Sequence, residues 1–116
     1  MLADGCFGID IADDQWFVVA QRQNGKNLFQ CQHFENTTAG LMSLINVIRS
    51  GAKKPKICIK STGRIALNVA LRLSSIPEAE VVMLSNTGLQ HFGAKVSNVG
   101  QKVAAEILAK VAERLI

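Results

Sequence analysis

The chain of 116 residues lacks the features that mark membrane-spanning or secreted proteins. No apolar run approaches the roughly 20 residues that a membrane helix needs. The first residues, Met-Leu-Ala-Asp-Gly, form neither a basic segment nor a long apolar stretch, as a secretory signal would. The three cysteines, Cys6, Cys31 and Cys58, cannot all pair within one chain. We therefore expect a cytoplasmic protein with reduced thiols and no membrane partner.

Signatures of several common sites are also absent. The sequence contains no glycine-rich phosphate loop, internal repeat or low-complexity segment. His33 and His91 lack partners at metal-ligand spacing, because Cys31 and His33 are merely alternate residues of one expected strand. We expect no zinc site. The cysteines lie on expected strands and are interpreted as buried thiols rather than nucleophiles.

Acidic residues are missing between Glu35 and Glu78. Seven bases fall in this stretch: Arg49, Lys53, Lys54, Lys56, Lys60, Arg64 and Arg72. Two interpretations stay open, a set of solvated loop and helix faces or a basic surface for nucleic-acid phosphates. The candidates for phosphate contacts are Arg49, Lys53, Lys54, Lys56 and Arg64. No aromatic residue lies among them, so stacking on single strands has no support. The net charge of +4 permits a polyanionic partner without requiring one.

The residues that are present suit one α/β domain, since 48% are hydrophobic and the length matches a single domain. Alternating patterns and turn signals, Asn24-Gly25 above all, predict strands over 6–12, 15–22, 27–34, 56–60 and 81–84. Helices are predicted over 38–50, 64–75 and 100–116, with a short one near 87–94. The helix over 64–75 has large apolar residues at every second position from Ile65 to Leu73. The order β-β-β-α-β-α-β-α predicts a five-stranded mixed sheet with helices on both faces.

Asp10 is the most suggestive single residue, because it lies inside the apolar strand Gly8-Ile9-Asp10-Ile11. A buried carboxylate needs a cation or hydrogen-bond donors. It could be satisfied by backbone donors or a lysine, or it could bind metal as in RNase H-like nucleases. Actin- and sugar-kinase-like ATPases also begin with such a strand. The following turn, Ala12-Asp13-Asp14-Gln15, disfavours them because its carboxylates would repel phosphate.

Five blocks follow one another along nearly the whole chain: FGIDIADDQWFVVA, HFENTTAGLMSLINVI, IKSTGRIALNVALRL, VVMLSNTGLQHFGAKV and GQKVAAEILAKVAERL. Together they resemble the N-terminal domain of DEDD transposases of the insertion-sequence-110 type and of Piv pilin-gene invertases. The most distinctive matches are Asn36-Thr37-x-x-Gly40 and Thr62-Gly63. The resemblance implies a single RNase H/RuvC-like domain over residues 1–116, without the family's C-terminal serine domain.

The resemblance also implies four acidic residues that hold Mg²⁺ for phosphodiester cleavage and strand transfer. They are an Asp on the first strand, a Glu two residues before Thr-Gly, and an Asp-x-x-Asp pair opening the last helix. Asp10 matches the first position, whereas Lys60, Gln101 and Ala104 occupy the other three. One carboxylate beside one ammonium cannot hold two dications. We therefore expect no metal cofactor, and we hypothesise that Lys60 supplies the counter-charge for Asp10.

Changing the alignment of the last helix does not recover the missing acids. The only substitutes within a few residues are Asn98 and Glu106. Glu106 lies two residues after Ala104, about 200° round a helix, and should face away from the site.

The sequence thus predicts a transposase-derived DNA recombination domain of a mobile element with a degenerate, catalytically inactive site. It would retain at most DNA or RNA binding or self-association, and the resemblance suggests a homodimer. Two alternatives stay open. One is a regulatory or protein-interaction module without a nucleic-acid role. The other is an active metal-dependent nuclease or transposase with unusual ligands.

Overall fold

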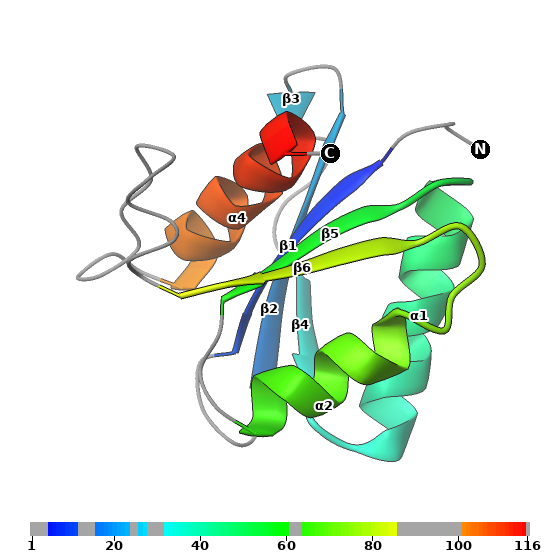
Figure 1. Ribbon diagram of the computed structural model, residues 1–116. Coiled ribbons are helices and arrows are strands. Elements are labelled where there is room, and N and C mark those ends of the chain that lie inside the picture. The colour runs from blue at the N-terminus through cyan, green and yellow to red at the C-terminus, as the bar shows by residue number, and fades with distance from the viewer. Residues whose placement is uncertain are drawn as a thin grey trace.

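A mixed sheet forms the centre of the computed structural model, which describes residues 5–11, 16–23, 26–27, 32–60, 64–85 and 101–115 (Figure 1). Its strands are β1 (Cys6–Ile11), β2 (Trp16–Gln23), β3 (Lys26–Asn27), β4 (Gln32–Glu35), β5 (Lys56–Lys60) and β6 (Glu80–Leu84). Their spatial order is β3-β2-β1-β5-β6, and β4 also pairs with β2. β1 pairs antiparallel with β2 and parallel with β5, and β5 pairs parallel with β6.

Helices cover both faces of this sheet (Figure 1). α1 (Thr38–Gly51) and α2 (Arg64–Leu73) pack on one face, and α4 (Gln101–Leu115) packs on the other. The α/β sandwich expected from the sequence is confirmed. The helix predicted near 87–94 lies outside the described residues. In the part of the chain that the structure describes, no helix combines the length and hydropathy needed to cross a membrane.

β1 is buried on both faces because it lies in the middle of the sheet. Successive side chains of a strand point to opposite faces. Phe7, Ile9 and Ile11 belong to the core beneath α1 and α2. Cys6 belongs to the core beneath α4, so Asp10, an even number of residues away, lies on the α4 face.

Gly8 lets α4 rest directly on the sheet. A Cβ atom at this position would overlap the carbonyl oxygen of Ala105 and the backbone nitrogen of Ala109, and would lie 2.7 Å from the carbonyl carbon of Leu108. Ala105 and Ala109 are themselves fully buried against β2. The helix and the strand therefore touch through their backbones, and only glycine fits at this point of β1.

The strand predicted over 27–34 is wrong as a single element. The structure has β3 and β4 instead, and both pair with β2. Asn27 is opposite Arg22 and Gln32 is opposite Val19, so the two pairings differ in register by two residues. One regular ladder cannot include both segments. Because they share one place in the sheet, the six strand segments fill the five expected strand positions.

α2 ends at Leu73, two residues before the predicted end. The hydroxyl groups of Ser74 and Ser75 donate hydrogen bonds to the carbonyl oxygens of Leu71 and Arg72, at 2.8 and 2.7 Å. Serine hydroxyls that bond to nearby backbone carbonyls compete with continued helix.

Candidate functional site

Asp10 and Lys60 lie side by side at the carboxyl ends of two adjacent parallel strands. Ile9 of β1 is in register with Ile59 of β5, so Asp10 and Lys60 occupy the next position along the two strands. Cys58 packs beneath α4. Lys60 is two residues later on the same strand, so it also lies on the α4 face, as Asp10 does. The parallel pairing of β1 with β5 therefore brings Lys60 next to Asp10, as the hypothesis of a counter-charge requires.

Asp10 is a buried residue, with 7% of its surface exposed. Burial raises the pKa of Asp10, and the nearby positive charge of Lys60 lowers it by a smaller amount. The net direction is upward, because the desolvation of the carboxylate outweighs the attraction of the ammonium. Lys60 therefore compensates part of the cost of burying Asp10.

The start of α4 forms the third side of this site. Glu113, near the end of α4, is ion-paired with Arg22, which lies opposite Cys6 at the beginning of β1. The first turn of α4 therefore lies toward the other end of β1, where Asp10 is. That turn contains no acidic residue. Ala104 is 2% exposed and packs in an apolar cluster with Cys58 and other residues.

Glu106 does not replace the missing acids. It lies seven residues before Glu113, which puts both residues on the same stripe of the helix. Glu113 reaches the guanidinium of Arg22, with 3.2 Å between Nε and Oε1, so this stripe lies over β2. Asp10 and Lys60 occupy the β1–β5 side. Asn98 lies outside the described residues.

In the described part of the chain, no three His, Cys, Asp or Glu side chains come together as a set of metal ligands. His33 is exposed on β4, whereas Cys31 and His91 lie outside the described residues. Cys6 and Cys58 are buried, and neither is in a disulfide. Burial raises the pKa of Cys58 to about 12, so this thiol stays protonated at neutral pH.

The structure divides the candidate phosphate contacts between two ends of β5. Arg49 and Lys53 line a common hollow near the end of α1, and Lys54 is exposed beside them. Lys56 begins β5 at the same end. Arg64 begins α2 just beyond the other end of β5, so it does not belong to that group.

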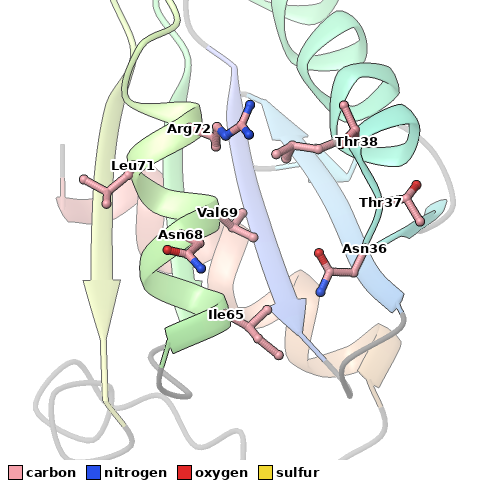
Figure 2. Close-up of a pocket in the computed structure, with 9 residues that line it drawn as sticks. Asn36, Thr37, Thr38, Ile65, Asn68, Val69, Leu71 and Arg72 are labelled. Atoms are coloured by element: carbon pink, nitrogen blue, oxygen red, sulfur yellow. The ribbon is translucent and has the colours of Figure 1, made fainter.

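A groove between α1 and α2 went unnoticed in the sequence. Figure 2 shows Ile65, Val69 and Arg72 pointing from α2 toward α1, with Asn36 facing them. Its volume is about 610 Å³, and it is lined by Asn36, Thr37, Thr38, Leu41, Ile65, Asn68, Val69, Leu71 and Arg72. The sequence contained one indication of such a surface. Large apolar residues occur at every second position from Ile65 to Leu73, and a helix cannot place all five of them on one face.

Of the two most distinctive matches, Thr62-Gly63 lies outside the described residues, and Asn36-Thr37-x-x-Gly40 has a structural role. Thr37 is the N-cap of α1, and its hydroxyl accepts a hydrogen bond from the backbone N–H of Gly40 at 3.0 Å. A Cβ atom on Gly40 would overlap the carbonyl oxygen of Glu35. The motif therefore shapes the corner between β4 and α1.

Comparison with known proteins identifies a family model that covers most of the chain. The family model for DEDD transposases of the insertion-sequence-110 type, described as "Transposase", matches residues 7–114. No curated protein matches the chain. Because the match spans nearly the whole sequence, the chain belongs to the insertion-sequence-110 family of DEDD transposases.

Proposed function

We propose that this chain is a transposase-derived DNA recombination domain that has lost metal-dependent catalysis and retains nucleic-acid binding or self-association. The observation that carries the proposal is the ammonium of Lys60 beside Asp10, at the carboxyl ends of β1 and β5. We place the domain in the reducing cytoplasm, where the buried Cys6 and Cys58 remain thiols.

The residues at this edge do not fit Mg²⁺. Two-metal cleavage of a phosphodiester needs several carboxylates to hold the ions about 4 Å apart. Among the described residues of this edge the carboxyl group is that of Asp10. Burial raises its pKa, and the neighbouring charge of Lys60 repels a cation. The first turn of α4 adds no acid, and Ala104 fills its position with an apolar contact.

Two assays test the loss of catalysis. Labelled DNA incubated with the protein and Mg²⁺ or Mn²⁺ should remain intact, and Mn²⁺ should show no binding by calorimetry. Metal-dependent cleavage that Asp10→Ala abolishes would overturn the proposal and favour an active enzyme with unusual ligands.

Restoring the family's acids provides the positive control. The triple variant Lys60→Glu, Gln101→Asp, Ala104→Asp should gain Mn²⁺ binding, whereas Lys60→Glu alone should not. Circular dichroism must show that the triple variant folds, because Ala104→Asp places a carboxylate in the apolar cluster beneath α4.

Nucleic-acid binding is tested with labelled duplex DNA and RNA at two salt concentrations. Phosphate contacts release counterions, so binding should weaken as salt rises. Lys53→Gln with Lys54→Gln should weaken it further. Lys110→Gln, an exposed lysine on α4, is the matched control. Sedimentation analysis of the same samples measures self-association. A monomer that binds neither nucleic acid would favour the regulatory or protein-interaction alternative.

A further inference from the structure

α2 presents two large apolar side chains to solvent. Leu67 is 49% exposed and Leu71 is 62% exposed, although both lie on a helix whose opposite face is fully buried. They are four residues apart and therefore neighbours on the helix surface. On α1, Met42 is exposed to a similar extent. Neighbouring exposed apolar side chains such as Leu67 and Leu71 are typical of protein interaction surfaces.

The charges within α1 and α2 are of one sign and one type. α1 and α2 contain no acidic residue and no lysine, and their charged residues are Arg49, Arg64 and Arg72. Protein–protein interfaces are enriched in arginine and methionine, and depleted in lysine, aspartate and glutamate. A solvated helix face would instead mix both signs of charge. The composition of the two helices is thus that of an interface.

The groove between the helices adds shape to this surface. Leu41, Ile65 and Val69 supply apolar lining, and Asn36, Asn68 and Arg72 supply polar groups (Figure 2). Arg72 is exposed at this groove, and Arg64 begins the same helix. A partner that inserts apolar side chains here would meet cations at both ends of α2.

We propose that the exposed surface of α2, formed by Leu67, Leu71, Arg64 and Arg72 beside the groove, binds an acidic amphipathic helix of a partner protein. Its apolar side chains would cover Leu67 and Leu71. Its carboxylates would pair with Arg64 and Arg72, since arginine binds carboxylates through two parallel hydrogen bonds. The inference does not depend on whether the site at Asp10 is active.

Charge complementarity disfavours the two other occupants. If α2 paired with itself about a two-fold axis, Arg64 of one copy would face Arg72 of the other, and like charges in contact destabilise an interface. A nucleic acid would satisfy the arginines, but it would leave Leu67 and Leu71 against phosphates. The surface also lacks lysine, which is common in phosphate contacts.

The test uses the full chain labelled with ¹⁵N and a synthetic helical peptide. The peptide has leucine at every third and fourth position and glutamate at the others. A control peptide replaces each glutamate with lysine. We expect the acidic peptide to shift amide resonances of α2 and of the groove, with weaker binding at high salt, and the basic peptide to leave them unchanged.

Two variants and one control assign the contact. Leu67→Ser with Leu71→Ser should weaken peptide binding by at least about tenfold, because central apolar contacts dominate interface energies. Arg64→Gln with Arg72→Gln should weaken it and reduce its salt dependence. Val103→Ser, on the similarly exposed valine of α4, should have no effect.

Three results would overturn the proposal. The first is equal binding of both peptides, or shifts confined to other elements. The second is a shift of the α2 resonances with protein concentration alone, which would identify a second copy as the occupant. The third is a shift of the same resonances by duplex DNA with no response to the acidic peptide.

Discussion

Replacing Lys60 with methionine tests the electrostatic core of the site. Methionine keeps most of the apolar stem of the lysine side chain and removes the positive charge beside Asp10. If the ammonium compensates the buried carboxylate, Lys60→Met must destabilise the protein at neutral pH. The same change in an Asp10→Asn background must cost much less, because no carboxylate is left to compensate. The four proteins form a double-mutant cycle.

The size of the coupling follows from the geometry. Neighbouring strands lie about 4.8 Å apart. Charges separated by about 5 Å in an effective dielectric of 20 attract by roughly 3 kcal/mol. Lys60 is only partly buried, so solvent screens this attraction. We expect a coupling free energy of about 1 to 2 kcal/mol. Its loss should lower the Tm of a domain of this size by about 4 to 8 °C.

Chemical denaturation at neutral pH measures the four free energies of unfolding. Lys54→Met is the control, because it removes an equal charge from an exposed position outside the site. An equal cost of Lys60→Met in both backgrounds would refute the idea that its charge acts on Asp10. A cost no greater than that of Lys54→Met would do the same.

The pH dependence of Asp10→Asn gives an independent check. Burial raises the pKa of Asp10 above its ordinary value of 3.8, so the folded state binds this proton more tightly than the unfolded chain. The contribution of Asp10 to stability is complete below 3.8 and is lost as the pH rises through the higher folded-state pKa. Relative to wild type, Asp10→Asn should therefore become more stable between acidic and neutral pH. A flat difference across that range would contradict the assignment.

Three further predictions concern the packing around the site. Gly8→Ala should lower the free energy of unfolding by at least about 3 kcal/mol, because the new methyl group overlaps the backbone of α4. Urea denaturation measures this change, and a smaller loss would show that α4 can move away. Cys58 should be inert to a thiol reagent in the native protein and react on unfolding, whereas prompt native labelling would contradict its burial and its pKa of about 12. Thr37→Ala should cost about 1 kcal/mol by removing the N-cap of α1, and Thr37→Ser should restore most of it.

Local patterns were sufficient for most elements of the fold. The strand predicted over 56–60 has the observed bounds, and the strand over 6–12 is one residue longer than β1. Each strand ends where the apolar pattern of the sequence ends, so this pattern alone can place the bounds of the strand. The predicted end of α2 is two residues too late. The hydroxyl groups of Ser74 and Ser75 end the helix, and the spacing of apolar residues carries no information about them.

The candidate site required information beyond local patterns. Asp10 was conspicuous as a polar residue in an apolar strand, but its pairing with Lys60 depends on a parallel contact between distant strands. The resemblance to a family supplied that pairing. Gly8 is a different case, because a glycine inside a strand signals a close approach without identifying the partner. The partner is a helix almost one hundred residues later in the sequence.

That distance has a consequence for biosynthesis. A chain that leaves the ribosome from its N-terminus can cover the α1–α2 face of the sheet once residues 38–73 have emerged. Among the described residues, the opposite face, which includes Cys6, Val18, Ala20 and Cys58, is covered by residues 101–115, which emerge later. A half-covered sheet of this kind exposes apolar surface, which promotes aggregation. Docking of α4 on Gly8 is the step that ends this exposure.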